Sequence, residues 1–390
     1  MRAYTTRGAG VTRRAGVTRG AGLTMVVLLS VACSAPEAPG QTSDDAGAPT
    51  LQTFVQVPQG FEISIFADGL SGVRMLELGP DDRLYAVRSS AGEVVRFELN
   101  ADGTASGGPA VVVSGLRQPF GLAFLDGDLY VGETHQVIRL RGPGFTQETI
   151  IVPGLPTGGH WTREIVFGPD GLLYLSVGSS CNLCEEGDER RAAVVRYAAD
   201  GSGEEIVGVG LRNAVGLAFH PVTGELWASQ NERDRLGDDV PAEELNILVP
   251  GGAVEDFGWP YCYENRIPNP EYPDAQRCAG TIAPALQMQA HSAPLGMVFY
   301  DQDQFPAEYR GDLFLAFHGS WNRSEPTGYK VVRIRVEDGQ PVSYEDFATG
   351  WLTGGGNVLG RPVAVEVGPD GSLYISDDGE GRIWRVRWAG

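Results

Sequence analysis

Basic side chains that stand at a similar distance before a repeated turn form the most informative chemical pattern in this sequence. Arg117, His160 and Arg212 each stand eight positions before a turn residue, while Arg361 stands seven before and Arg74 five before. A guanidinium group binds carboxylates through paired hydrogen bonds, and an imidazole with an unshifted pKa accepts a proton near neutral pH. If these segments meet in the folded chain, they form a site for an anionic small molecule with a general base beside it.

Each of these residues also has a purely structural interpretation. A single arginine most often forms a surface ion pair, and His160 can be an ordinary loop histidine. Gly158 and Gly159 precede His160 and allow a ligand to approach the backbone closely, which favours the site. His318 follows the second strand of its repeat, so ligand contact and packing both remain open for it.

The loop of residues 231–239, with the sequence NERDRLGDD, is rich in side-chain oxygen atoms. Ca²⁺ takes roughly six to eight oxygen ligands, although this loop lacks the spacing of an EF-hand. We interpret the loop as a candidate Ca²⁺ site, and a solvated charged loop is the alternative.

Five cysteines are present, and four of them are predicted to form disulfides. We expect Cys262 and Cys278 to brace the loop between them. Cys181 and Cys184 are expected to close a short loop, with a redox-active dithiol as the alternative. No His follows Cys184 as in a haem-attachment motif, and no second C-x-x-C completes a zinc site.

The fifth cysteine, Cys33, belongs to a predicted export signal over residues 1–33. Five arginines and no acidic residue stand in residues 1–20, and a short apolar run follows over residues 21–32. A small residue before Cys33 resembles a bacterial lipobox, so Cys33 is a predicted lipidation site, with ordinary cleavage as the alternative. Residues 34–50 are expected to be a flexible linker. The predicted location is therefore periplasmic or cell-surface, with membrane contact only through an N-terminal lipid anchor.

Composition excludes several functional classes. The formal charge of −20 disfavours a nucleic-acid partner, because a phosphate backbone would be repelled. Lys330 is the only lysine, which argues against Schiff-base and P-loop chemistry. The sequence contains no nucleophile elbow, no H-E-x-x-H and no G-x-G-x-x-G after a strand, so serine-hydrolase, zinc-protease and nicotinamide chemistries lack support.

A repeated pattern predicts the fold that positions these residues. An apolar strand, a turn such as Gly-Pro-Asp, and a Leu-aromatic pair recur, with the pairs beginning at residues 84, 129, 173, 226, 313 and 373. A period of about 45 residues with short alternating strands is typical of four-stranded propeller blades. Residues 51–390 are therefore predicted to form one all-β domain, a six-bladed β-propeller with its main insertion at residues 250–292. The loops before the innermost strands then converge on one mouth of the central channel.

Several stretches resemble a known family. Residues 159–186, 210–239, 291–332 and 360–386 are similar to the L-sorbosone dehydrogenase group of the soluble quinoprotein sugar dehydrogenases, and the Arg-Asn pair at 212–213 and the HGSWNR segment carry much of the likeness. The resemblance spans roughly residues 55–388. It implies a six-bladed propeller that binds pyrroloquinoline quinone (PQQ) and Ca²⁺ at the channel mouth.

The same resemblance implies roles for individual residues. His160 matches the general base, Arg212 and Asn213 match a cofactor contact, and Arg361 lies near a second cofactor-binding arginine. The cofactor-binding set also includes Arg74, Arg117 and His318. Asn231, Glu232, Arg233 and Asp234 match the calcium segment, partly through backbone carbonyls. Val215 stands where glucose-oxidising relatives have glutamine, and Lys330 does not obviously replace their cofactor lysine, so glucose specificity is not implied.

The implied activity is oxidation of a sugar or aldehyde, with His160 taking a proton as hydride passes to PQQ. Because the chain has no haem motif, the electrons would pass to an external acceptor such as a cytochrome or a quinone. Two alternatives are a non-catalytic propeller that binds carbohydrate or protein and a calcium-dependent lactonase.

Overall fold

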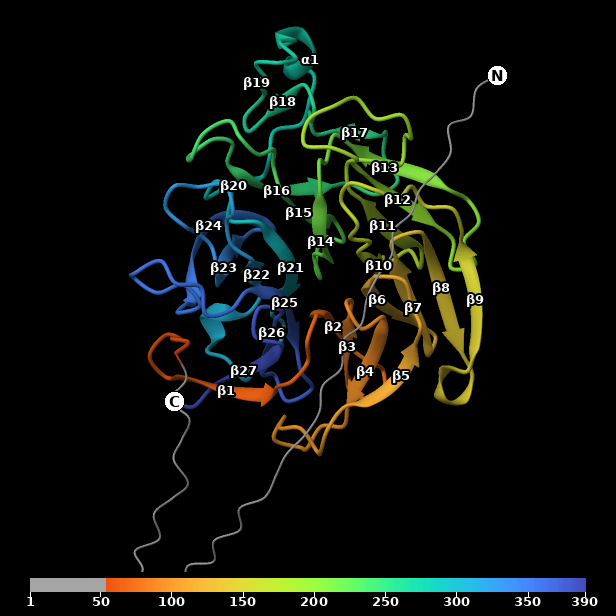
Figure 1. The fold of residues 1–390 in the computed structure, drawn as a ribbon, viewed down its shortest axis with the longest axis vertical. Coiled ribbons are helices and arrows are strands. Elements are labelled where there is room, and N and C mark those ends of the chain that lie inside the picture. Colours follow the sequence, from red (N-terminus) through yellow and green to blue (C-terminus); the bar gives the residue numbers. More distant parts are fainter. Residues whose placement is uncertain (1–53) are drawn as a thin grey trace, which may run out of the picture. The chain divides into compact units, whose positions relative to one another are not determined.

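A computed structural model describes residues 54–390, which form six β-sheets arranged as blades around a central axis (Figure 1). The innermost strands β2, β6, β10, β14, β21 and β25 lie nearest the centre. The predicted six-bladed propeller is therefore confirmed. The predicted signal, linker and lipidation site at Cys33 lie outside the described residues.

Blades 1 to 3 follow one another along the chain, each running from the inner strand outward. Blade 1 contains β2 (Val73–Leu78), β3 (Leu84–Arg88), β4 (Glu93–Phe97) and β5 (Ala110–Ser114). Blade 2 contains β6 (Pro119–Leu125), β7 (Asp128–Glu133), β8 (Gln136–Arg141) and β9 (Gln147–Val152), with the 3₁₀ helix η1 (Pro143–Phe145) between the last two. Blade 3 contains β10 (Ile165–Phe167), β11 (Leu173–Val177), β12 (Ala193–Tyr197), β13 (Glu205–Val209) and a parallel fifth strand, β17 (Glu255–Asp256).

Blades 4 to 6 complete the ring. Blade 4 contains β14 (Ala214–Phe219), β15 (Leu226–Gln230), β16 (Glu243–Leu248) and β20 (Leu286–Met288). Blade 5 contains β21 (Pro294–Phe299), β22 (Leu313–Phe317), β23 (Lys330–Glu337) and β24 (Gln340–Ala348), with the 3₁₀ helix η2 (Ala307–Tyr309) between the first two. Blade 6 contains β25 (Pro362–Val367), β26 (Leu373–Asp377), β27 (Arg382–Trp388) and β1 (Phe61–Ala67).

The ring closes because the first strand completes the last blade. β1 pairs antiparallel with β27, from Phe61 opposite Trp388 to Ala67 opposite Ile383. The Phe61 ring packs edge-on against four aromatic rings, those of Phe305, Tyr309, Phe347 and Trp388, at centroid distances of 4.7–5.2 Å. Closure therefore joins the two ends of the ring through backbone pairing and a shared aromatic core.

The insertion predicted at residues 250–292 lies between β16 and β21. It contains β17, β20, the small two-stranded sheet of β18 (Cys262–Tyr263) and β19 (Ile267–Pro268), and the short helix α1 (Ala275–Ala279). The Cys262–Cys278 disulfide braces it, as predicted. No helix within residues 54–390 is long and apolar enough to cross a membrane.

The repeated Gly-Pro-Asp and Leu-aromatic motif has one structural cause in blade 3. Gly168 begins the turn, and a Cβ atom there would lie 2.8 Å from the ring of Tyr174 and 2.9 Å from that of Phe219. The Tyr174 hydroxyl donates a hydrogen bond to Asp170 at 2.8 Å. Glycine thus leaves room for the aromatic ring, and the aspartate pairs with its hydroxyl group, which fixes the turn between the first two strands of the blade.

A shared irregularity turns the start of the inner strands toward the axis. β2, β6, β14, β21 and β25 each have a register shift near their first residue. A bulge of this kind bends a strand and redirects its side chains. The loops before these strands, which include Arg212, Asn213 and Arg361, therefore meet at one mouth of the channel, and the loop that carries His160 joins them before β10, which has no such shift.

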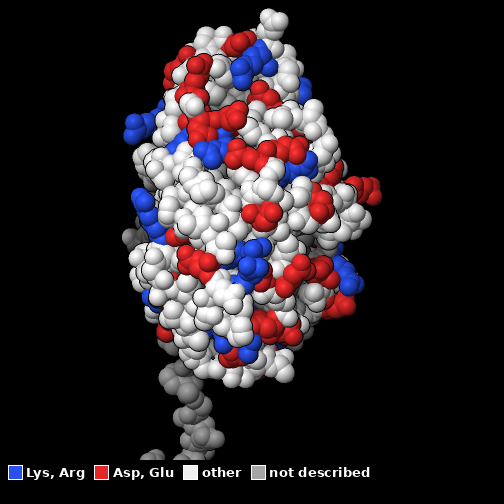
Figure 2. All heavy atoms as spheres, turned by 90° about the vertical axis from the view of Figure 1, so that its right-hand side faces the viewer, with Lys and Arg blue, Asp and Glu red and all other residues white. Residues whose placement is uncertain are grey.

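The outer surface carries charges of both signs. Figure 2 shows acidic side chains distributed over one face with basic ones between them, and the chain's formal charge is −20. A mixed acidic surface of this kind keeps a protein soluble and repels polyanions.

We expect Gly168→Ala to lower the free energy of unfolding by about 1–3 kcal/mol, because the added methyl group overpacks the Tyr174 and Phe219 rings. Gly108→Ala is the matched control, because a Cβ atom there meets nothing within 4 Å. Urea denaturation of both variants tests this. Equal midpoints for the two variants would show that the turn glycine is not required for packing.

Candidate active site

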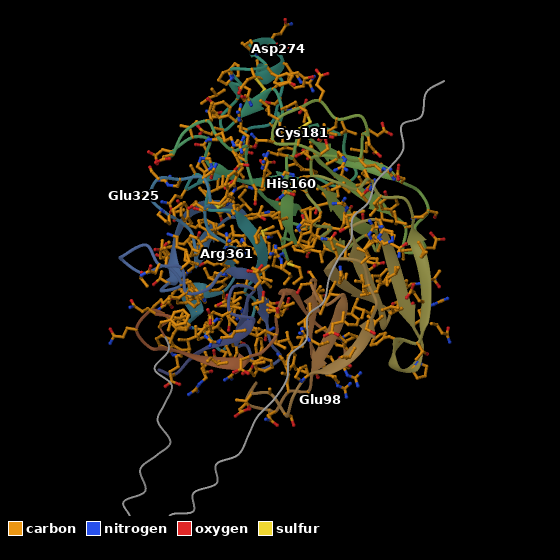
Figure 3. The ribbon with its side chains drawn as sticks, viewed as in Figure 1. Glu98, His160, Cys181, Asp274, Glu325 and Arg361 are labelled. Carbon is orange, nitrogen blue, oxygen red and sulfur yellow. A yellow bond between two sulfur atoms is a disulfide. The ribbon has the colours of Figure 1, made fainter. Side chains whose placement is uncertain are left out.

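A cavity of about 410 Å³ lies at the mouth where the loops before the inner strands meet. Its wall contains most of the residues selected from sequence, namely Arg74, His160, Arg212, Asn213, Asn231, Glu232, Asp234, His318 and Arg361. Figure 3 shows His160 and Arg361 near the middle of the ring, whereas Glu98 and Asp274 lie at its periphery. The predicted convergence of these segments is correct.

Two predicted side chains do not reach this cavity. Arg117 is exposed, and its backbone N–H donates to the carboxylate of Glu133 while the chain turns at Gln118, which has φ of 48°. The register argument placed the Arg117 backbone correctly near an inner strand but gave its side chain the wrong direction. Arg233 points away, and its guanidinium donates to Asn269 at 2.5 Å and Glu271 at 2.6 Å. Only the backbone of Arg233 therefore remains available to the cavity segment.

His160 is held in an orientation that suits a proton acceptor. Its Nδ1 lies 3.1 Å from the carbonyl oxygen of Ser179 and 3.0 Å from the Ser179 hydroxyl. A carbonyl can only accept, so Nδ1 carries the hydrogen and Nε2 carries the lone pair. Nε2 has no hydrogen-bond partner in the described part of the chain, and the side chain lines the cavity.

The pKa of His160 is strongly shifted, in contrast to the unshifted value expected from sequence. Burial is the main cause, and the nearby positive charge of Arg212, with smaller effects from Arg163 and Arg191, adds to it, so that the pKa of His160 falls to about 3. The imidazole is therefore neutral at physiological pH. In that state it can accept a proton, and an anion bound nearby would raise its pKa.

Arg212 joins three segments around the cavity and is only 4% exposed. Its Nη1 donates to the carbonyl oxygens of Asn231 at 3.0 Å and Glu232 at 2.7 Å. Its Nε and Nη2 donate to the backbone and side-chain oxygens of Asn182, and Nη2 also reaches Asp234 at 3.3 Å. Arg212 thus organises the predicted calcium segment from within the protein.

Asn213 lines the cavity and carries a buried, unsatisfied polar atom beside His160. Its side-chain Oδ1 is buried and has no hydrogen-bond partner. A Cβ atom at Gly178 would lie 2.3 Å from this oxygen and 2.6 Å from the Cβ atom of His160, so only glycine allows both side chains their positions. An orphaned buried amide beside a base is typical of a site that receives a ligand.

Another part of the wall contains His318, Arg74 and Arg361, and Asp378 pairs with two of them from outside the cavity lining. Asp378 accepts from His318 Nε2 at 2.9 Å and forms an ion pair with Arg74 at 2.5 Å. Although burial alone would raise it, hydrogen bonding and charge from His318 and Arg74 hold the pKa of Asp378 at about 2. Burial lowers the pKa of His318 to about 4.

Arg361 is the cation that lacks a carboxylate partner. It donates to the carbonyl oxygens of His318 at 3.3 Å and Gly319 at 3.1 Å. Within residues 54–390 no Asp or Glu lies within ion-pair distance of its guanidinium group. Its charge is therefore available to an anionic ligand.

Oxygen atoms of the 231–234 segment face the other side of the cavity, where the buried Glu243 supports them. The two oxygens of Glu243 accept from the backbone N–H groups of Glu232 at 2.7 Å and Ala293 at 3.0 Å. Burial raises the pKa of Glu243 to about 8 and also raises that of Glu232. A divalent cation would stabilise the ionised forms of such desolvated carboxylates, and an oxygen-only donor set suits Ca²⁺.

Several lining residues were not among the sequence predictions, namely Trp161, Glu243, His291, Trp321 and Asn322. Asn322 Nδ2 contacts both Asp234 at 3.1 Å and His291 at 3.4 Å, so three loops meet at the cavity. Asn322 lies in the HGSWNR segment, which was a usable signal. Glu243 gave none, because a glutamate at the start of a strand is usually solvated.

Comparison with known proteins agrees with the six-bladed propeller fold. The sequence model of the TrAA12-like family matches residues 55–389. A PQQ-dependent pyranose dehydrogenase of Coprinopsis cinerea is 24% identical over 87% of this chain and 56% of its own length. The aldose sugar dehydrogenase YliI of Escherichia coli is 28% identical over 60% of this chain and 62% of its own length. This chain therefore spans less than two thirds of either relative.

The solved PQQ domain of the Coprinopsis cinerea pyranose dehydrogenase, in its holo form, superposes with a TM-score of 0.76 at 24% identity, covering 88% of this chain and 99% of that domain. That likeness extends over the whole ring of blades. The match of the family over nearly all described residues then identifies the chain: it belongs to the TrAA12-like family of six-bladed propellers, whose characterised relatives include soluble PQQ-dependent sugar dehydrogenases.

Proposed function

We propose that this protein is a PQQ- and Ca²⁺-dependent dehydrogenase that oxidises a sugar or an aldehyde, with His160 as the general base. The observation that carries the proposal is the neutral imidazole of His160, whose Nε2 has no hydrogen-bond partner in the described chain and whose cavity is also lined by Asn213 and by Arg361, which lacks a carboxylate partner. A base beside an anion-binding wall is the arrangement that such a reaction needs.

The residues of the cavity fit a polycarboxylate cofactor such as PQQ. Arg361 offers a guanidinium group without a carboxylate partner, and Arg74 offers an Nε atom that has no hydrogen-bond partner. Arg212, Asn213 and His318 complete the polar wall. Arg117 is not part of this set, because its side chain is exposed.

The oxygens of Asn231, Glu232 and Asp234, with the backbone of Arg233, would hold Ca²⁺ beside the cofactor. Arg212 already occupies one lone-pair direction of the Asn231 and Glu232 carbonyls, which leaves the other direction available. When bound, PQQ with its Ca²⁺ supplies a two-electron acceptor that takes hydride from the substrate carbon.

The chain's own residues supply positioning and proton transfer. Ser179 fixes the His160 ring so that Nε2 can take the proton of a substrate hydroxyl group, either of a sugar or of a hydrated aldehyde. Burial, with a smaller contribution from the cations Arg212, Arg163 and Arg191, keeps the ring neutral, so that Nε2 can accept this proton. The Trp161 and Trp321 side chains also line the cavity.

An L-sorbosone-like substrate rests on the sequence resemblance alone. The electrons are proposed to pass to an external cytochrome or quinone. The protein is proposed to act after export, in the periplasm or at the cell surface, held by a lipid anchor at Cys33. A carbohydrate-binding propeller and a calcium-dependent lactonase are the alternatives, and neither requires PQQ.

We expect the purified protein to oxidise aldoses or sugar aldehydes with an artificial electron acceptor only when both PQQ and Ca²⁺ are added, because the arginine wall and the oxygen-rich segment each hold one of them. Dye reduction is measured after chelation and after separate re-addition of each component. Unchanged activity in the stripped protein would refute the proposal, and lactone hydrolysis without PQQ would favour the lactonase.

His160→Ala is expected to bind PQQ but to lose at least about a hundredfold in turnover, since a general base typically contributes about 10²–10⁴-fold. Its melting temperature should change little, because the cavity wall is polar and few apolar contacts are removed. PQQ affinity, melting temperature and turnover are measured on one preparation. A destabilised variant with normal specific activity would assign His160 a structural role instead.

The pH dependence of stability checks the shifted pKa of His160 independently of catalysis. The folded-state pKa of about 3 lies below the unfolded value near 6.5. Between these values the unfolded chain binds a proton that the folded chain does not, so His160 lowers stability as the pH falls. The wild type should therefore lose about 1–2 kcal/mol more than His160→Gln between pH 7 and pH 5. Parallel stability curves for the two proteins would contradict the shift.

A further inference from the structure

The loop from Ser179 to Cys184, between β11 and β12, contacts the proposed base His160 and also Arg212 and Asp234, which lie at the proposed Ca²⁺ segment. On the base side, the Ser179 carbonyl accepts from the backbone N–H of His160 at 3.0 Å as well as from its Nδ1. The Ser179 hydroxyl donates to the Cys181 carbonyl at 2.7 Å, which ties this contact to the loop.

On the side of the cavity that contains Arg212 and Asp234, Asn182 forms hydrogen bonds through every polar atom of its side chain. Its Oδ1 accepts from Arg212 Nη2 at 3.0 Å and from the backbone N–H of Asp234 at 2.7 Å. Its Nδ2 donates to the Asp234 carbonyl at 3.1 Å, and its own carbonyl accepts from Arg212 Nε at 3.1 Å and from the Trp259 indole at 3.3 Å. One residue thus fixes both Arg212 and the backbone at Asp234.

The Cys181–Cys184 disulfide closes this loop around Asn182. Both cysteines are partly accessible, whereas Cys262 and Cys278 of the other disulfide are 2% and 0% exposed. Cys181 lies close to His160 and well away from the periphery marked by Asp274 in Figure 3. A reductant therefore reaches the bond beside the cavity more readily than the one in the insertion.

We propose that Asn182 is a positioning residue of this site and that the Cys181–Cys184 disulfide latches it, so that opening the bond lowers activity. The inference rests on the proposed function for its catalytic consequence, but the positioning itself is a property of the protein without cofactor. Asn182 and Ser179 act through Arg212, Asp234 and His160 rather than by touching substrate.

Opening the latch is a thiol–disulfide exchange with a dithiol. One thiolate of the dithiol attacks a sulfur of the bond and forms a mixed disulfide, and its second thiol then releases the protein cysteine. The protein gains two thiols with their two protons, and the dithiol becomes a disulfide. With the latch open, Asn182 has fewer constraints holding it against Arg212 and Asp234.

Asn182→Ala tests the positioning, with Asn357→Ala as the matched control, since Asn357 is exposed and its side chain forms no hydrogen bond within the described chain. Amide hydrogen exchange of the cofactor-free protein should become faster around residues 231–236 in Asn182→Ala only, because the Asp234 N–H loses its acceptor. Unchanged exchange there would overturn the proposal whatever the protein's activity.

Ca²⁺ affinity and kcat are then measured on the same variants. Loss of a group that orients metal ligands typically costs about 10- to 100-fold in affinity or activity, so Asn182→Ala should weaken Ca²⁺ binding and lower kcat by that amount. Asn182→Asp retains the acceptors for Arg212 and the Asp234 N–H and should lose only roughly two- to tenfold. Equal losses in the two variants would contradict positioning through these acceptors.

The latch is tested by mild reduction with dithiothreitol, with mass mapping of the opened bond. Opening Cys181–Cys184 while Cys262–Cys278 stays intact should reproduce both the faster exchange near Asp234 and the fall in kcat. The double variant Cys181→Ser, Cys184→Ser should show the same loss and no further response to reductant. Full activity in the selectively reduced protein would refute the latch. Faster exchange in a protein that never oxidises sugars would leave positioning supported and refute the proposed function alone.

Discussion

The site depends on the burial of Arg212, whose guanidinium group is surrounded by protein oxygen atoms and retains little contact with water. Its donors are shared among Asn182, Asn231 and Glu232, which come from two separate loops. A buried cation is tolerated only when its hydrogen bonds are satisfied, so these loops must adopt the conformations that supply the acceptors. The fold and the site are therefore coupled at this residue.

The electrostatic consequence extends across the cavity. Burial, with a further contribution from the positive charge of Arg212, Arg163 and Arg191, keeps His160 neutral. Arg361 has no carboxylate partner to neutralise its own charge. Acidic groups stand on the other wall, where the pKa of Glu243 is raised by burial. One small space thus presents a cationic side suited to carboxylates and an oxygen-rich side suited to a divalent cation. The net charge of −20 would repel an anion from the protein as a whole, and the cationic side of the cavity would offset that repulsion locally.

The propeller fold could be predicted from the sequence because each repeat contains contacts between residues that are close together in the chain. Gly168, Asp170 and Tyr174 interact within one turn, so their spacing is visible as a motif in the sequence. The position of each loop before its inner strand followed from counting back from that turn. The direction of the Arg117 side chain did not follow, because it depends on a positive φ at Gln118 and a contact with Glu133.

The chemistry of the site was only partly predictable for a related reason. The residue types at 160, 212 and 213 were recognisable, but the shift in the pKa of His160 arises from burial and from arginines brought together by folding. Glu243 and Asn182 gave no signal, because their roles consist of hydrogen bonds to backbone groups distant in sequence. Local motifs therefore predicted the architecture, and tertiary contacts set the reactivity.

The feature on which the proposed chemistry depends is that burial, together with the positive charge of nearby arginines, keeps His160 neutral until an anion binds. Its most direct test is an NMR titration of the His160 imidazole in the cofactor-free protein and in the presence of PQQ, with the signal assigned by comparison with His160→Gln. The account predicts a pKa far below 6.5, near 3, without PQQ and a clear rise when PQQ is bound. A pKa close to 6.5 in both states would contradict it.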